Sequence, residues 1–299
     1  MRSAVWGAVS VLLAALAAAP APALPLPQDE RERACWLAMT RERTRVKLNE
    51  PTAVDFSNLR DGYEVRSPFQ VDFAIRGMGV VPAGKPHAKA GHHHLLVNTP
   101  LPSNVGDKIP FSDKHRHFGK GQTGTTLSLP PGTHKLRLLF ADHDHRPYFV
   151  YSPEITVKVL GPREGPAPRI APANGQAACE AWYQDEVARP RGEGKRLLVG
   201  NLRLGEPVVS PFNVRLAVDG FGVAARGHGG EGLGHFMLDV LGAGGRPVQA
   251  VDLSHGATQV NLFLAAGSYV LRVRFVSDSG SDLLPPLEHP VTVTAQERF

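Results

Sequence analysis

The chain has 299 residues, with 33 Lys or Arg against 28 Asp or Glu, which gives a formal net charge of +5. The basic residues are spread along the chain and form no cluster interleaved with aromatic residues, which argues against a nucleic-acid-binding protein. An aromatic content of 7% argues against a carbohydrate-binding platform, and the length suffices for one large or two ordinary domains.

The first 23 residues have the features of a secretory signal peptide. Arg2 supplies a short positive region, and residues 4–19 are apolar but too few and too alanine-rich for a good membrane span. Small residues suggest cleavage near Ala23; an uncleaved anchor is the alternative. No later segment is long and apolar enough to cross a bilayer. We therefore expect a soluble periplasmic or secreted protein that does not span the membrane after cleavage.

The rest of the chain resembles itself. "SPFQVDFAIRGMGVVPAG" at 67–84 matches "SPFNVRLAVDGFGVAARG" at 210–227, and "GHHHLLV" at 91–97 falls on "GHFMLDV" at 234–240. After a small gap, residues 121–140 match residues 256–275. Residues 161–176, rich in Pro and Gly, are the expected linker. The sequence predicts two homologous domains, 28–160 and 177–299.

Each copy alternates apolar and polar residues in short segments separated by Gly and Pro turns. Examples are "FQVDFAI", "HKLRLLF" and "EITVKVL" in the first copy and "FNVRLAV", "YVLRVRF" and "HPVTVTA" in the second. Only the region after each cysteine has room for a helical turn or two. The pattern predicts an all-β fold with two tandem antiparallel β-sandwich domains, loosely immunoglobulin-like.

Three consecutive histidines stand at the start of one predicted strand. In the second copy Phe236 lies on the core face, and this phase places its counterpart His93 inward. His92 and His94 then share the opposite face, about 6–7 Å apart along the strand. Two imidazoles in this arrangement form half of a common type of metal site, and they need partners from elsewhere in the chain.

The first copy offers such partners, and the second does not. Nine of the 13 histidines lie in the first copy, so the sandwich itself does not require them. His117, His143 and His145 are the expected further ligands, with His115 as the next candidate. Asp142 and Asp144 are expected to orient the rings from behind, and His93 is expected to be a core residue or to support the site from behind through a hydrogen bond to backbone. The second copy retains His235 beside Met237 and Asp239, and we expect it to bind metal weakly or not at all.

A cluster of neutral imidazoles suits copper, zinc or nickel. The usual affinity order of divalent ions rises toward copper(II), so copper ranks first and zinc second. No thiolate is near the cluster in sequence, which argues against a structural zinc site of the cysteine type. The stretch "GKGQTG" at 119–124 matches a dinucleotide-binding pattern, but a strand and a proline turn follow it where that pattern requires a helix.

Cys35 and Cys179 occupy equivalent positions, one in each copy, so a disulfide within one domain is impossible. In an oxidising compartment two thiols tend to pair. We therefore expect a Cys35–Cys179 bridge between the domains, with a disulfide-linked dimer or buried free cysteines as the alternatives.

The motifs "GHHHLLV", "HFGKGQT" and "PPGTHKLRLLFADHDHRP" with the closing "ITVKV" resemble the exported bacterial family named domain of unknown function 4399. The resemblance covers most of residues 67–160 and is faint in the second copy. It implies an exported β-rich domain, no particular reaction, and family histidines at His92, His93, His94, His117, His143 and His145. The stretch "RPYFVYSP" after His145 departs from the family pattern, which has another histidine and further prolines there.

Three functions compete. The first is a periplasmic, non-enzymatic metal-binding protein whose partner is a metal ion, with another envelope protein as a further candidate. The second is a metal-dependent hydrolase or oxidoreductase that uses the same histidines and leaves one ligand position open to water. The third is an envelope- or carbohydrate-binding module without metal, which an exposed aromatic platform would favour.

Overall fold

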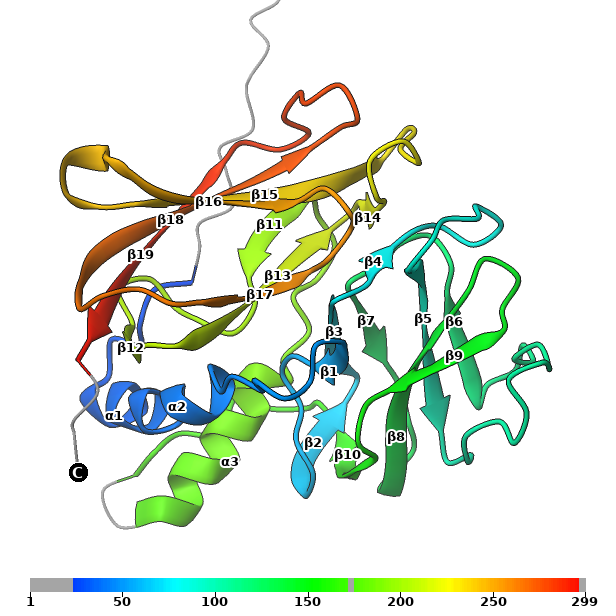
Figure 1. The fold of residues 1–299 in the computed structure, drawn as a ribbon. Helices are drawn as coiled ribbons and strands as arrows, with labels where there is room; N and C mark the ends of the chain where they lie inside the picture. The colour runs from blue at the N-terminus through cyan, green and yellow to red at the C-terminus, as the bar shows by residue number, and fades with distance from the viewer. Residues whose placement is uncertain (1–23, 172–174, 296–299) are drawn as a thin grey trace, which may run out of the picture.

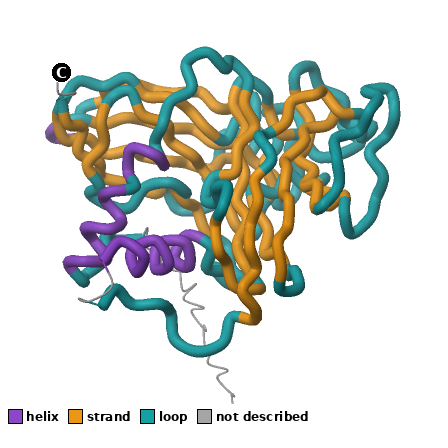
Figure 2. Tube along the Cα trace, turned by 90° about the horizontal axis from the view of Figure 1, so that it is seen from below, coloured by secondary structure: helices purple, strands orange, loops and turns teal. Residues whose placement is uncertain are grey.

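The computed structural model describes residues 24–171 and 175–295, so the predicted signal peptide lies outside the described residues. Among the residues described, no helix is long and apolar enough to cross a membrane. Strands dominate, and three helices lie together against one side of them (Figures 1 and 2).

The first half of the chain forms two facing sheets. One sheet has the order β1 (Ala53–Phe56), β3 (Phe69–Arg76), β7 (Gly124–Leu127). The other has the order β2 (Tyr63–Ser67), β10 (Ile155–Pro162), β8 (Gly132–Ala141), β5 (Ala90–Val97), β4 (Gly79–Val80). In addition, β6 (His115–Phe118) pairs with β5, and β9 (Pro147–Tyr151) pairs with β8.

The second half has the same strand order, with one strand fewer. One sheet is β11 (Arg196–Val199), β13 (Phe212–Asp219), β17 (Gln259–Leu262). The other is β12 (Pro207–Val209), β19 (Leu287–Thr294), β18 (Gly267–Val276), β15 (Leu233–Leu241), β14 (Gly222–Val223), with β16 (Pro247–Leu253) beside β15. A short 3-10 helix, η1 (Ala243–Gly245), connects β15 to β16. Among residues 175–295, strand β9 has no counterpart.

The predicted all-β class is confirmed: each half is a β-sandwich. In β10 alternation buries one face, since Ile155, Val157 and Val159 are buried and the residues between them are not, whereas β3, β5 and β13 are buried on both faces. The pairing is mostly antiparallel as predicted, but β2 runs parallel to β10 and β4 parallel to β5. The same two parallel pairs recur in the second half. Parallel neighbours arise because the connections here are crossovers and not hairpins.

The helices are longer than expected and contain the cysteines. They are α1 (Glu30–Ala38), α2 (Thr40–Arg43) and α3 (Gly175–Val187). The carboxylate of Asp29 caps α1 by accepting the N–H groups of Arg31 and Glu32. The sequence predicts helical turns only after each cysteine, whereas α1 and α3 begin before Cys35 and Cys179.

The helices are exchanged between the halves: α3, which precedes the second half in the chain, covers the first sandwich, and α1 and α2, which precede the first half, cover the second sandwich. Asn58, in the first sandwich, donates to the carbonyl of Val187 at the end of α3, and Asn201, in the second, donates to the carbonyl of Arg43 at the end of α2. Trp36 on α1 donates to Glu206 at 2.8 Å, and the guanidinium of Arg43 pairs with the same carboxylate. The two helical segments are therefore exchanged between the sandwiches about an approximate twofold axis.

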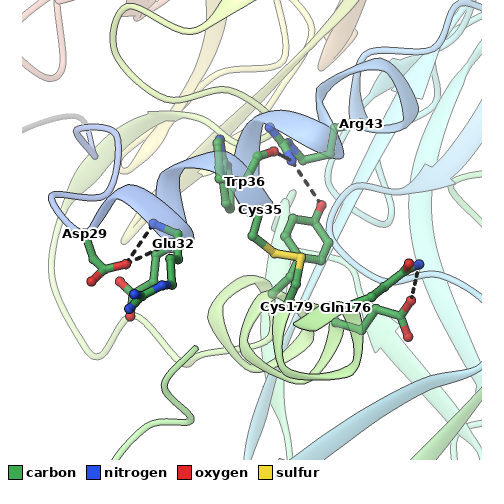
Figure 3. The surroundings of a disulfide bond; sticks show 10 residues. Asp29, Glu32, Cys35, Trp36, Arg43, Gln176 and Cys179 are labelled. Atoms are coloured by element: carbon green, nitrogen blue, oxygen red, sulfur yellow. Dashed lines mark hydrogen bonds between the residues drawn. A yellow bond between two sulfur atoms is a disulfide. The ribbon is translucent and has the colours of Figure 1, made fainter. Parts of the chain in front are cut away.

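Cys35 and Cys179 form a disulfide where the exchanged helices meet, with their Cα atoms 5.6 Å apart (Figure 3). Trp36 and Tyr183 pack beside it, with ring centroids 5.6 Å apart. Equivalent residues meet each other only near a twofold axis, so the disulfide lies close to the axis that relates the halves.

The helix exchange bears on the proposed domain boundaries. A fragment 28–160 would lack α3, and a fragment 177–299 would lack α1 and α2, so each would expose the surface that the missing helix covers. We retain 28–160 and 177–299 as a proposal about sequence units, with the linker at 161–176. The ordered strand β10 extends into this linker as far as Pro162, and α3 begins at Gly175.

Candidate metal centre

Strand β5 carries the three consecutive histidines, and all three are buried. His92 and His94 point to the face of the sheet that lies away from the sandwich core, together with Leu96. The loop after β5 covers this outer face: Ile109 packs with Leu96 and Leu139 in a separate apolar cluster. His92 and His94 are both 0% exposed for this reason.

The neighbouring strands bring two further imidazoles to His92 and His94. His117 on β6 lies directly opposite His94 in the antiparallel register. On the other side, β8 ends at Ala141 opposite His92, and the turn that follows β8 returns His145 to the same face. Strand register thus assembles four imidazoles from three segments of the chain.

The ring nitrogens converge. The Nε2 atoms of His92 and His94 are 3.1 Å apart, and those of His117 and His145 are 3.2 Å apart. His92, His94 and His117 each offer a nitrogen such that all three atoms lie within 4.8 Å of one another. The Nδ1 atoms of His92 and His94 are buried without a hydrogen-bond partner among the described residues. The nitrogens that converge are therefore Nε2 atoms, whose partners are one another, while the Nδ1 atoms on the other side of these two rings have none.

The spacing of the four rings resembles a tetrahedron. A ring bound through one nitrogen at about 2.0–2.1 Å has its centroid about 3.2 Å from the ion, so two rings are about 5.2 Å apart at the tetrahedral angle. A square-planar ion would place neighbouring rings about 4.5 Å apart and opposite rings about 6.4 Å apart. The six separations observed are 5.0, 4.8, 5.0, 5.1, 5.9 and 4.8 Å, and none reaches the square-planar diagonal.

Burial keeps the central imidazoles neutral. Desolvation, followed by the proximity of His117 and His145, lowers the pKa of His92 to about 3. Desolvation and the neighbouring histidines lower the pKa of His94 to about 2. Desolvation also lowers the pKa of His117. Because metals bind the neutral imidazole, these residues are ready to bind an ion throughout the physiological pH range.

His145 adopts a strained backbone conformation. Its φ is +66°, in the left-handed region that a residue with a Cβ rarely adopts. At the equivalent turn of the second half this position is Gly280, with φ +83° and the same hydrogen bond to the residue three positions earlier. A histidine therefore stands where the turn favours glycine, and its ring lies beside that of His117, with centroids 4.8 Å apart.

Three residues predicted for the site lie elsewhere. His143 is exposed on the turn after β8, and no ring contact joins it to the cluster, because only His145 occupies the position that turns back to the sheet. Asp142 makes no hydrogen bond to an imidazole of the cluster; its carboxylate accepts the N–H groups of Asp144 and Arg146 and so shapes the turn. Asp144 instead pairs with Lys108 and Arg146 at the surface.

His93 lies in the sandwich core, opposite to its two neighbours. Its ring centroid is 4.7 Å from that of Phe73 and 5.0 Å from that of Phe140. Neither ring nitrogen has a hydrogen-bond partner among the described residues, and desolvation lowers its pKa to about 3. Its environment is therefore that of an apolar packing residue, and Phe236 occupies the equivalent position in the second half.

Sequence reasoning missed Phe111. This side chain is 64% exposed, and its ring centroid lies 4.9 Å from that of His117 and 5.0 Å from that of His145. It covers the two imidazoles that are only half-buried. No spacing or periodicity signals this role, because the loop that carries Phe111 is positioned by the burial of Ile109.

The second half has no comparable cluster among its described residues. His235 is buried and aligns with His92, and Met237 pairs with Asp252 in register as His94 pairs with His117. Desolvation lowers the pKa of His235. One imidazole, one thioether and one carboxylate thus replace the ligand set, and Gly280 takes the position of His145.

Fold and cluster together define a two-domain β-sandwich protein with a candidate four-histidine metal centre. Residues 71–160 match the family described as Domain of unknown function (DUF4399), which confirms the resemblance seen in the motifs. Among curated proteins, none matches the chain.

Several solved structures resemble the chain at low similarity. CopC from Methylosinus trichosporium OB3b has 18% identity and a TM-score of 0.21, and the match covers 32% of this chain and 89% of that chain. The fibronectin(III)-like modules of Clostridium thermocellum CbhA have 10% identity and a TM-score of 0.23, covering 81% of this chain and 94% of that chain. A two-domain fibronectin type-III segment from chicken tenascin has 13% identity and a TM-score of 0.19, covering 81% and 98%. No functional conclusion follows from likenesses of this size.

Proposed function

We propose that this protein is an exported, non-enzymatic binding protein for a transition-metal ion. His92, His94, His117 and His145 are the proposed ligands. The observation that carries the proposal is the gathering of four imidazoles, two buried and two half-buried, with Nε2 atoms 3.1 Å apart in one pair and 3.2 Å apart in the other. Without an ion, such a site desolvates polar nitrogens and gains little in return.

Copper and zinc are the candidate ions. Imidazole ligands suit both, and the affinity order of divalent ions favours copper(II). The near-equal ring separations favour a tetrahedral ion, and zinc(II) in structural sites is tetrahedral. The affinity order ranks copper first and zinc second, and we keep this ranking. The ring geometry, in contrast, favours zinc.

The alternatives receive less support. Four protein ligands complete a tetrahedral shell and leave no position for water, whereas catalytic zinc sites keep one position open. Phe149 and Tyr151 are exposed, but their ring planes meet at 77° and do not form a flat platform for a sugar. A binding role therefore fits the site better than catalysis or carbohydrate recognition.

The test is to determine the metal content of the full-length mature protein after export to a bacterial periplasm. We expect one equivalent of copper or zinc by elemental analysis. Titration of metal-free protein with each ion, in competition with a chelator of known affinity, ranks the two ions. Protein that is exported without metal and binds neither ion stoichiometrically would refute the proposal.

A further inference from the structure

A second pair of imidazoles lies where the two halves meet, outside the four-histidine cluster. His87 belongs to the loop between β4 and β5, and His228 to the loop between β14 and β15. Their ring centroids are 4.8 Å apart, with ring planes at 85°. His228 aligns with Lys85 of the first half and not with His87, so the duplication alone does not produce this pair.

The separation of the two rings fits a shared ion. Two imidazoles on one ion have centroids about 4.5–5.2 Å apart for angles between square-planar and tetrahedral. The observed 4.8 Å lies within this interval and equals the smallest separation inside the cluster.

The ring of His87 has the tautomer that a metal requires. Its Nδ1 lies 2.8 Å from the carbonyl oxygen of Ala88. A carbonyl only accepts, so Nδ1 carries the proton and donates, which leaves the Nε2 lone pair free. A bond of this kind on the far nitrogen is the usual way in which proteins orient a ligating histidine.

The backbone around His228 is held from both sides. The ammonium of Lys85 donates to the carbonyl oxygens of His228 and Gly229, at 2.8 and 3.2 Å. The N–H of Gly229 donates to the carboxylate of Asp278 at 2.9 Å. These bonds tie the loop of the second half to the first half, so the two imidazoles approach each other on a supported backbone. Lys85 and Asp278 also place opposite charges on either side of the loop.

We propose that His87 and His228 form a second metal-binding site that holds a divalent ion such as Zn²⁺, Cu²⁺ or Ni²⁺ between the two halves. With two protein ligands, water completes the shell. His87 is exposed and His228 half-buried, so this site exchanges ions more readily than the buried cluster and binds them more weakly. The proposal stands whether or not the cluster binds metal.

Titration of the full chain with Zn²⁺ alone, by calorimetry, tests the site. Wild-type protein should bind a weaker equivalent besides the cluster's own, and this weaker equivalent should remain in a His92→Ala/His94→Ala background. In both backgrounds, His87→Ala and His228→Ala should each weaken it at least tenfold. The double substitution should add little more, because either single change already destroys the chelate.

His255→Ala is the matched control, since this histidine is also exposed in the second half. It should leave both binding events unchanged. The proposal is wrong if no second equivalent is found, if it survives both substitutions, or if His255→Ala weakens it equally. Loss of only the tightly bound equivalent in the His92→Ala/His94→Ala protein tests the four-histidine cluster, and it neither supports nor contradicts the site at His87 and His228.

Discussion

Replacement of His145 by glycine separates the cost of its backbone strain from its role as a ligand. The residue sits at φ +66° in a turn whose counterpart carries Gly280. A residue with a Cβ in the left-handed region destabilises the folded state by about 1–2 kcal/mol, and glycine removes this cost. Glycine also gives the unfolded chain more conformational freedom, which offsets about 0.4–1 kcal/mol of the benefit. His145→Gly should therefore stabilise the metal-free protein by up to about 1.5 kcal/mol while it weakens metal binding at least tenfold.

Two control variants isolate the backbone term. His145→Ala removes the ligand but keeps the strain, so it should be less stable than His145→Gly and equally weak in binding. Gly280→Ala places a Cβ at φ +83° with no atom within 4 Å, so any loss of stability there is backbone strain, expected at about 1–2 kcal/mol.

The assays are urea unfolding of the metal-free proteins and zinc or copper titration against a competing chelator. A His145→Gly protein that is clearly less stable than wild type would contradict the strain assignment. A His145→Gly protein with wild-type affinity would remove His145 from the ligand set.

Three further predictions concern other parts of the molecule. His93→Phe introduces the residue found at this position in the second half. It should raise the unfolding free energy by about 1–3 kcal/mol, because it removes two unpaired ring nitrogens from the core, and the variant should still bind metal. A destabilised or metal-free variant would contradict this. The metal-free protein should lose about 2 kcal/mol of stability for each of His92 and His94 between pH 7 and pH 5. Below about pH 6.5 these histidines are protonated in the unfolded chain, whereas in the folded protein their pKa values of about 3 and 2 keep them neutral. A urea-unfolding free energy that does not change over this pH range would contradict the prediction. The Cys35→Ser/Cys179→Ser protein should lose about 4–5 kcal/mol in the chain-entropy model, because the bridge closes a sequence separation of 144 residues; unchanged thermal unfolding under non-reducing conditions would argue against the bridge.

The same pKa values limit how far metal affinity should fall at low pH. Four ligands with the reference histidine pKa of about 6.5 would each lose about 25-fold in neutral fraction between pH 7 and pH 5. His92 and His94 remain neutral over that range, so they contribute no such loss. Affinity should therefore fall by at most about 600-fold, and not by about 4 × 10⁵ as for four exposed ligands.

The sequence predicted the class of fold because strand alternation is local. The pattern in "ITVKVL" and the glycine and proline turns are read along the chain, and the two copies support each other. The helix exchange could not be predicted, because the contact joins the side-chain amide of Asn58 to the carbonyl of Val187, far away in the sequence, and every residue carries such a carbonyl.

The candidate site was predicted in part for the same reason. The phase of β5 follows from Phe236 in the other copy, so the opposite orientations of His92 and His93 could be predicted from alternation. The choice between His143 and His145 depends on a turn in which one position has positive φ, and that requires backbone geometry. The alignment of His145 with Gly280 carried a hint, because glycine marks left-handed positions.

Burial of the outer face could not be predicted. Alternation assigned His92 and His94 to a face away from the core, which usually faces solvent. The loop that carries Ile109 covers that face, and neither periodicity nor a motif signals where a loop will pack.

The most direct test of the central claim compares two changes within the same motifs. His92→Ala/His94→Ala removes two buried ligands, whereas His143→Ala removes an exposed histidine two residues from His145. The content of tightly bound metal in the full-length proteins after export should fall from one equivalent to none in the cluster variant, with circular dichroism unchanged. It should remain at one equivalent in His143→Ala. Full metal content in a folded His92→Ala/His94→Ala protein, or its loss in His143→Ala, would contradict the account.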